Sequence, residues 1–431
     1  MADLKTITQS ELAEVIREHE GMLKGHGGIR RANLSFHDLV NEWLPGLDFS
    51  TADFSGSNLQ RAILTWTNFT QATMFCTDLR VADLRRANMT GCDLRGACLR
   101  GCDLTDAIMI NADMREGVLG SHDGSQAKYE HRIADISAAI APRADFTGAK
   151  MSSSFVAQTD FTDAILRNAS LVGADMRNCL FVGAQMEGAD LSGSNMMGAN
   201  LGGANLSGVT LGNANFAGAD LTGAIIDPDA MQSPELQDAT LPKLDTTIAG
   251  RLDEILLAHR QWANSDGGAQ ADLSNADLSG LDLHAVNLGA AVLTAAVLKA
   301  ANLTASVLSM ADLSGADMRE VTLCQADMRG VRLERATLNG ADLTGADLGP
   351  LESVGASGRV WRSALSHARF RNADLTGAKL AGADLKGASL DDACLREADL
   401  SKADVADASF RGADLTGANL QGTNMAAAYL D

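Results

Sequence analysis

The chain has 431 residues, of which 46% are apolar and only 4% aromatic, with 42 glycines and a net charge of −20 at pH 7. This composition excludes one bulky hydrophobic core and favours thin, regular layers. The acidic excess argues against direct binding to nucleic acid. The N-terminus lacks a basic segment followed by an apolar run, and no eighteen consecutive apolar residues occur, so we expect a cytoplasmic protein that does not bind a membrane.

Bulky apolar residues recur every five positions from Leu34 to Leu119, and a small residue stands two positions before most of them. Similar runs occupy about three quarters of the chain. Five residues of α-helix turn about 500°, which would carry an apolar stripe around the helix. Five residues of strand would place it on alternating faces. The chain must therefore change direction once per unit, so each unit is one side of a coil.

The units read A-D-L-S-G at 189–193, A-N-L-S-G at 204–208 and A-D-L-T-G at 219–223. In these units the chain resembles the pentapeptide-repeat family, whose A(D/N)LXX units fold as a right-handed quadrilateral β-helix with four units per coil. The resemblance implies that the central Leu or Phe and the residue two before it point inward. Coils would then stack at about 4.8 Å, the spacing of paired strands. The expected fold class is an all-β-dominated solenoid with short capping helices.

Two interruptions lie within the repeat. The first, at 120–143, contains Ile133, Ile136 and Ile140 at i, i+3 and i+7, which predicts a helical insertion laid on the solenoid. The second, at 349–359, is predicted to be a surface bulge. All prolines are expected at such irregular places, because proline cannot donate to a backbone ladder.

A helical segment occurs twice, since residues 11–28 align with residues 251–268. The duplication indicates two homologous modules, each opening with a helix. The predicted organisation is an N-terminal capping helix at 1–31, a first β-helix at 32–243, a second capping helix at 244–270 and a second β-helix at 271–431.

The end of a β-solenoid exposes an apolar cross-section and an unpaired edge, so each helix is expected to be a lid over its first coil. A helix that binds a partner is the alternative. The apolar residues and histidines of the two copies repeat at helical spacing. The lid residues expected are Leu12, Ile16, His19, Leu252, Leu256, His259 and Trp262.

Residues twenty positions apart should stack on one face. Trp43, Trp66, Arg85 and Arg86 then share a face, and Arg86 lies one coil from Trp66 at the same position in the unit, which predicts a cation–π contact. Aromatic and arginine side chains are favoured at protein interfaces, so this is the candidate partner-binding face. The alternative is a solvated wall on which the arginines pair with neighbouring aspartates such as Asp83.

The sequence indicates no enzyme. Its aspartates come with the repeat and have no recurring His, Ser or Cys partner, and the glycine-rich calcium-binding repeat is missing. The seven cysteines are scattered, and Cys92, Cys102 and Cys179 occupy inward positions as small buried thiols. No catalytic residue, cofactor, metal site or disulfide is expected.

The function that remains is a non-catalytic scaffold or adaptor for another protein, as a monomer or homodimer. The alternative is a DNA mimic that binds a type II topoisomerase, since members of the family implicated in quinolone resistance bind DNA gyrase. Each regular block carries a net charge of only about −3 to −5, against roughly twelve negative charges on duplex DNA of similar length. The family's gyrase-directed members also typically dimerise through a C-terminal helix, which is not found here.

Overall fold

Parallel β-bridges recur every five residues along the computed structural model and join each coil to the next. Asp53, for example, pairs with Asn33 in the coil before it and with Thr73 in the coil after it. The Phe54 N–H donates to the Thr73 carbonyl (2.7 Å), and the Asp53 N–H donates to the Ala32 carbonyl (3.0 Å). Because paired residues are twenty positions apart and bridges recur every five, each coil has four sides.

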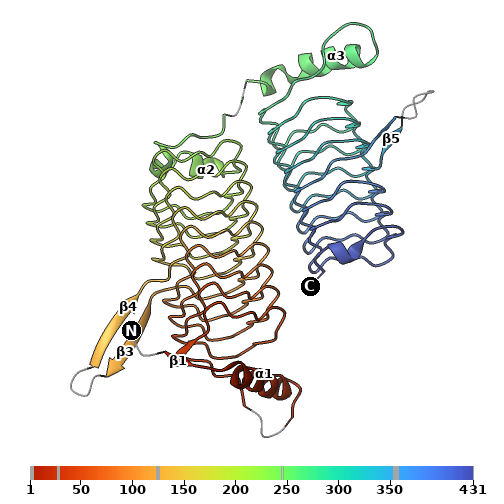
Figure 1. The fold of residues 1–431 in the computed structure, drawn as a ribbon. Coiled ribbons are helices and arrows are strands. Elements are labelled where there is room, and N and C mark those ends of the chain that lie inside the picture. Colours follow the sequence, from red (N-terminus) through yellow and green to blue (C-terminus); the bar gives the residue numbers. More distant parts are fainter. Residues whose placement is uncertain are drawn as a thin grey trace. The chain divides into compact units, whose positions relative to one another are not determined.

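The chain divides into two units, Met1–Pro242 and Lys243–Asp431, each with its own apolar core. Figure 1 shows each unit as a stack of coils whose colour advances steadily from one end of the stack to the other. The structure describes residues 4–26, 30–122, 127–243, 245, 247–352 and 359–430.

The letters of the repeat have separate physical roles. The central Phe54 and the small Ala52 are fully buried. The Asp53 carboxylate accepts from the Ser55 N–H (2.9 Å), which closes the turn after the central residue. The next residue, Gly56, turns the corner with φ +66°. Left-handed backbone favours glycine, which explains much of the glycine content of the chain.

A β-ribbon, and not a helix, occupies the first interruption. Strands β3 (Gly117–His122) and β4 (Ala127–Arg132) pair in antiparallel and project from the first unit (Figure 1). Residues 123–126 of this segment lie outside the described residues. The helix predicted within 120–143 is therefore wrong.

The spacing that suggested a helix belongs to the coil itself. Ile136 is a fully buried central residue, whereas Ile133 and Ile140 are 41% and 49% exposed. The next central residue is Ala141, so this unit lacks the bulky side chain by which the register is recognised. The ladder resumes at Asp135, which pairs with a residue 37 positions earlier instead of 20. The ribbon is therefore an insertion that projects outward, and the stacking of the coils continues across it.

Pro142 also lies inside a regular coil, where its carbonyl accepts from the Asp106 N–H (3.1 Å). It directly follows a central residue. At the same position of another unit, the Ser50 N–H donates to the Asp48 side chain (2.9 Å) and not to a neighbouring coil. Proline at this position therefore removes no ladder hydrogen bond. The expectation that every proline marks an irregular place is wrong for Pro142.

The base of the β3–β4 ribbon packs closely against the coils at Gly96. A Cβ on Gly96 would lie 2.8 Å from the Cys76 Sγ and 3.0 Å from the Arg132 carbonyl, and Gly96 also has φ +66°. We expect Gly96→Ala to lower the free energy of unfolding by the left-handed strain of about 1–2 kcal/mol plus the cost of displacing the ribbon. Gly193→Ala is the control, because Gly193 has φ +64° and nothing within 4 Å. Equal losses in urea denaturation would show that the ribbon does not press on this position.

Short elements complete the two units. Strands β5 (Leu351–Glu352) and β6 (Val360–Trp361) pair in antiparallel at the second interruption, whose residues 353–358 lie outside the described residues. The short helices are α2 (Pro228–Met231), η1 (Pro234–Leu236), η2 (Ala249–Arg251) and η3 (Met425–Ala427). No helix among the described residues has the length and apolar character needed to cross a membrane.

The far end of the first unit has a cover that the sequence did not predict. Helix α2 and the following turn η1 lie at this end (Figure 1), and Leu236 is buried in the core of the unit. The apolar cross-section of the last coils is therefore partly covered by the connector itself.

Candidate functional site

Each unit begins with one copy of the duplicated helix. Helix α1 (Gln9–Leu23) starts with a capping box, in which the Glu11 N–H donates to the Thr8 side chain and the Thr8 N–H donates to the Glu11 carboxylate. Leu12 is buried in the core of the first unit, and Ile16 packs against it. Strand β1 (Lys5–Thr6), just before the helix, pairs in parallel with β2 (His37–Asp38) of the first coil.

Helix α3 (Leu252–Ala263) covers the second unit in the same way. Leu252 and Leu256 are partly buried and pack against the core of that unit. Trp262 is 39% exposed and stacks on His259, with ring centroids 5.3 Å apart. The sequence predicted that the apolar residues and histidines of both helices form the face of a lid. In the structure their side chains point toward the first coil or, for Trp262, pack beside it on His259.

The two equivalent histidines bind the first coil through the same atom. The His19 Nδ1 accepts from the Ala32 N–H (3.1 Å), and the His259 Nδ1 accepts from the Ala271 N–H (3.0 Å). In later five-residue repeats a backbone carbonyl accepts the equivalent hydrogen bond. The Ala52 N–H, for example, donates to the carbonyl three residues earlier. The imidazole thus replaces the acceptor that a first coil lacks.

An imidazole Nδ1 can accept only when it carries no proton, so both rings must be neutral with the proton on Nε2. Both histidines are fully buried. Burial lowers the pKa of His19 and of His259 below the usual value, which favours the neutral ring.

The four residues predicted to form a binding face lie on one side of the first unit. Trp43 pairs with Ile63, which pairs with Asp83 in the next coil. Arg85 follows Asp83 by two residues on this side, and Trp66 and Arg86 lie at the corner that ends it, with φ +62° and +59°. The surface formed by Trp43, Ile63, Trp66, Arg85 and Arg86 is called the tryptophan wall below.

A column of alternating aromatic, basic and acidic side chains runs along this wall. The Arg86 guanidinium lies 4.6 Å from the centroid of the Trp66 ring. Asp106, in the next coil, is 3.4 Å from Arg86 and 2.7 Å from Arg143, and its side chain is only 6% exposed. The indole is thereby held at one end of a packed ion-pair column.

The arginines of the wall are paired, as the alternative reading of the sequence required. Arg85 lies 2.6 Å from Asp83 and 3.7 Å from Asp103. The hydrogen bond from Arg85 lowers the pKa of Asp83, so this carboxylate stays ionised. The same pairing within one five-residue repeat recurs at Asp78–Arg80, Asp93–Arg95, Asp113–Arg115, Asp175–Arg177 and Asp327–Arg329.

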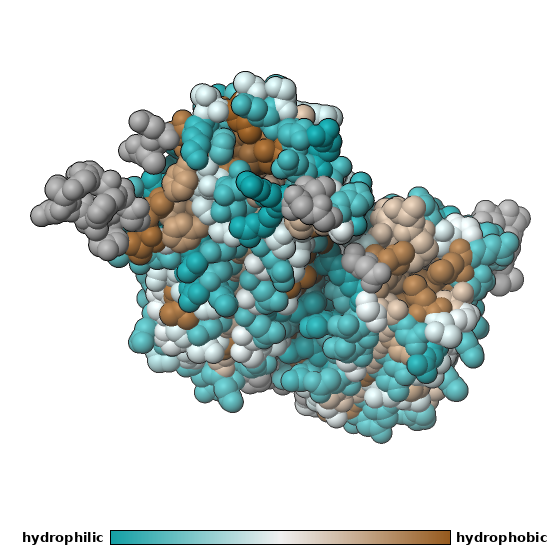
Figure 2. Space-filling view, turned by 90° about the horizontal axis from the view of Figure 1, so that it is seen from below, coloured by the Kyte–Doolittle hydropathy of each residue, from teal (hydrophilic) through white to brown (hydrophobic). Residues whose placement is uncertain are grey.

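Large apolar side chains are exposed on the tryptophan wall and at Val81, the corner residue that precedes this side of its coil. Trp43 is 72% exposed, Trp66 and Val81 are each 60% exposed, and Ile63 is 39% exposed. Figure 2 shows that, across one face of the molecule, hydrophobic residues gather in separate patches on a largely hydrophilic surface. Clusters of exposed apolar residues are common at interaction sites, which keeps the wall a candidate.

Four of the seven cysteines, Cys76, Cys92, Cys102 and Cys179, are buried, and the other three are partly buried. The Cys102 thiol donates to the Leu79 carbonyl (2.8 Å), and burial raises the pKa of Cys102 and of Cys179 to about 12. All seven cysteines are free. No group of three or more His, Cys, Asp or Glu side chains suited to a metal ion occurs in the part of the chain that the structure describes.

Four-sided coils of five-residue units, capped by a helix and joined by parallel bridges, define a β-helical repeat protein. The chain belongs to the pentapeptide-repeat family. The family model, described as pentapeptide repeats, matches overlapping segments that together span residues 32–119, 134–227, 282–349 and 361–430. A comparison with curated proteins finds no match.

Several solved structures are similar to this chain. Rfr23, a pentapeptide repeat protein from the cyanobacterium Cyanothece 51142, is 21% identical over 33% of this chain and 90% of its own, with a TM-score of 0.25. HetL from Nostoc sp. strain PCC 7120, involved in heterocyst differentiation regulation, is 20% identical over 98% and 97%, with a TM-score of 0.12. Full-length QnrB1, a plasmid-mediated fluoroquinolone resistance protein, is 19% identical over 51% and 99%, with a TM-score of 0.21.

Proposed function

We propose that the protein is a cytoplasmic, non-catalytic scaffold whose units are rigid right-handed quadrilateral β-helices and whose tryptophan wall binds another protein. The observation that carries this proposal is the Trp66 ring, which is 60% exposed although Arg86 holds it at 4.6 Å. Tryptophan and arginine are enriched among the residues that dominate binding energy. A side chain already fixed before binding loses less conformational entropy when the partner arrives.

The charges of the wall support a protein partner over DNA mimicry. A surface that imitates duplex DNA needs a dense row of carboxylates, at about one charge per 1.7 Å of axis. Asp83 and Asp106 instead lie within 2.7 Å of arginine nitrogens, and the exposed residues between the pairs are apolar. Charge pairing of this kind leaves the aromatic rings as the most prominent recognition elements of the wall.

The double substitution Trp66→Ala/Arg86→Ala is expected to remove the partner. Truncating residues that dominate an interface costs about 2 kcal/mol or more, which corresponds to an affinity loss of about 30-fold. Affinity purification of the tagged full chain, followed by quantitative mass spectrometry, identifies proteins that the wild type recovers and the variant does not. Titration of the recovered partner then measures the change in affinity.

Arg177→Ala is the matched control, because Arg177 forms the same kind of ion pair with Asp175 (2.7 Å) on a different ladder of the same unit. It should recover the same partner as the wild type. An identical set of recovered proteins with and without the wall substitutions would refute the proposal. Recovery of a type II topoisomerase by every variant would instead favour the DNA-mimic alternative.

A further inference from the structure

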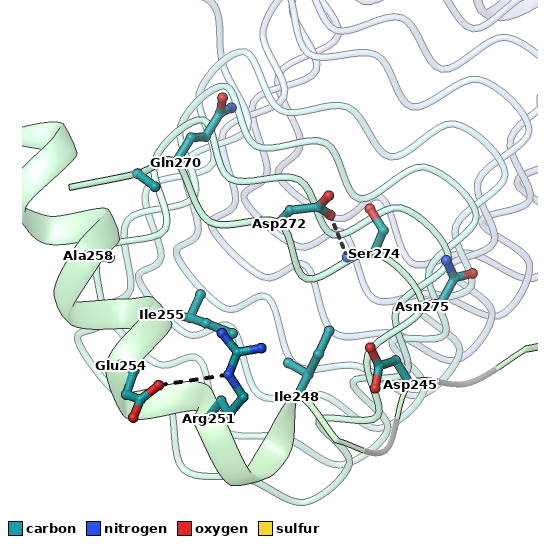
Figure 3. Close-up of a pocket in the computed structure, with 11 residues that line it drawn as sticks. Asp245, Ile248, Arg251, Glu254, Ile255, Ala258, Gln270, Asp272, Ser274 and Asn275 are labelled. Carbon is teal, nitrogen blue, oxygen red and sulfur yellow. Dashed lines mark hydrogen bonds and ion pairs between the residues drawn. The ribbon is translucent and has the colours of Figure 1, made fainter.

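A pocket of about 700 Å³ lies between the cap and the first coil of the second unit. Figure 3 shows Ile248 and Ile255 on the helix side and Asp272, Ser274 and Asn275 on the coil opposite. The pocket therefore has an apolar wall on one side and a polar stretch of extended backbone on the other.

The polar side of this pocket is an open edge of the β-ladder. One coil further on, the Val292 N–H donates to the Ala271 carbonyl (2.9 Å), and the Val292 carbonyl accepts from the Leu273 N–H (2.7 Å). Asp272 holds the same position in the first coil. The chain segment before this coil pairs with it only further along the edge, where Asp245 bridges to Ala276 and the Asp245 N–H donates to the Asn275 carbonyl (2.9 Å). Among the described residues, the backbone N–H and carbonyl of Asp272 have no hydrogen-bond partner.

The Ser274 carbonyl completes this edge. In the next coil the equivalent Thr294 carbonyl accepts from the Asn275 N–H (2.9 Å), whereas no described N–H donates to the carbonyl of Ser274. The edge thus offers one donor and two acceptors at the spacing of a parallel strand. Such an edge is a template on which an extended peptide adds by main-chain hydrogen bonds.

The charged residues around the pocket favour a basic peptide. The lining includes three carboxylates, on Asp245, Glu254 and Asp272, and one guanidinium, on Arg251, which lies 3.8 Å from Glu254. Hydrogen bonds from the side chains of Thr247 and Ser274 lower the pKa values of Asp245 and Asp272. These two carboxylates are therefore ionised at neutral pH, and the rim has an excess of negative charge.

The duplicated cap shows which side chains leave this space open. Because His259 corresponds to His19, Ala258 corresponds to Glu18, and in the same alignment Asp245 corresponds to Lys5. Ala258 lines the pocket and presents only a methyl group to it. A larger side chain at residue 258 would project into the pocket, and the same change at residue 18 would affect only the other cap.

We propose that this pocket binds an extended basic peptide segment of a partner protein, which adds as a strand to the edge at Asp272 and Ser274. An apolar side chain of the peptide packs against Ile248 and Ile255, and its flanking Lys or Arg side chains face the carboxylates of the rim. The site lies on the second unit and does not depend on the tryptophan wall.

The test uses the full chain and two blocked, fluorescein-labelled heptapeptides, Lys-Val-Lys-Val-Lys-Val-Lys and the same sequence with Glu in place of Lys. In fluorescence anisotropy, the basic peptide is expected to bind saturably and the acidic peptide at least about tenfold more weakly, because the rim is negative. Ala258→Leu should weaken binding of the basic peptide by about tenfold or more, which is 1.4 kcal/mol. Glu18→Leu, the matched change in the other cap, should leave the affinity unchanged.

Hydrogen exchange distinguishes strand addition from general attraction to an acidic protein. Saturating basic peptide is expected to slow exchange in the peptic fragment that contains Asp272 and Ser274. Equal affinity of the basic peptide for wild type and Ala258→Leu would overturn the proposal, as would unchanged exchange in that fragment. Absence of saturable binding by the basic peptide would overturn it as well.

Discussion

Phe161→Ala is expected to lower the free energy of unfolding of the first unit by about 3–5 kcal/mol, the cost of removing a large buried aromatic side chain. The Phe161 ring is fully buried and is stacked on Phe181 with centroids 5.1 Å apart. It also packs edge-to-face with Phe146, with centroids 5.4 Å apart. Hydrogen bonds to the coils on both sides fix the spacing of the layers, so the structure cannot collapse into the cavity, and the full cost is retained.

Phe155→Ala is the matched control for this prediction. Phe155 lies in the preceding five-residue repeat, on a different ladder from the tryptophan wall, and is 44% exposed, so its loss should change stability by about 0.5 kcal/mol or less. Hydrogen exchange followed by mass spectrometry at increasing urea concentration reports each unit separately. Since the second unit has its own core, its protection should stay unchanged. Equal losses in the two variants would contradict the layered packing described here.

The repeat register could be predicted because the coil places every fifth side chain in the same environment. Phe54 is buried for the same reason as Leu59 and Leu64, and a run of such positions specifies a coil without any knowledge of its neighbours. The duplicated caps could be found for a similar reason, since the two copies carry the same face toward equivalent coils. Local periodicity was sufficient for both features.

The ribbon β3–β4 could not be predicted from that periodicity, because its residues project from the coils and do not follow the five-residue pattern. Its return is marked by the unit A-D-I-S-A at 134–138, which fits the repeat. The following five-residue repeat could not be recognised, because its central residue is Ala141 and not a bulky apolar residue. The isoleucines around it then matched a helical spacing, although the parallel ladder had already resumed at Asp135.

The ribbon also explains which part of the candidate wall could be read from the sequence. Trp66 and Arg86 are twenty positions apart, so their contact follows from the coil length alone. Arg143 completes the same column but lies 37 positions after Asp106, since the ribbon intervenes. Pairing across an insertion depends on where the ladder resumes, which only the three-dimensional structure supplied.

Acidification is expected to loosen both caps, because His19 and His259 accept backbone hydrogen bonds only as neutral rings. Burial lowers the pKa of each ring in the folded protein. Around His19, the charge of Arg31 also lowers the pKa, whereas the charges of Asp48 and Glu20 raise it. The unfolded chain therefore binds a proton that the folded chain does not. The contribution of each ring to stability is complete above about pH 6.5 and decreases as the pH falls toward the folded-state pKa, by up to about 1.4 kcal/mol per pH unit.

Hydrogen exchange in α1 and α3 between pH 7.5 and 5, corrected for the intrinsic rate, measures this loss. The double variant His19→Gln/His259→Gln retains a side-chain acceptor that does not titrate, so its caps should show a flatter pH dependence. His131→Gln is the control, because His131 is exposed on the ribbon, where it contacts Glu116 (2.6 Å) and touches neither cap. The same pH dependence in the wild type and the double variant would mean that carboxylates, and not these two rings, determine the acid stability of the caps.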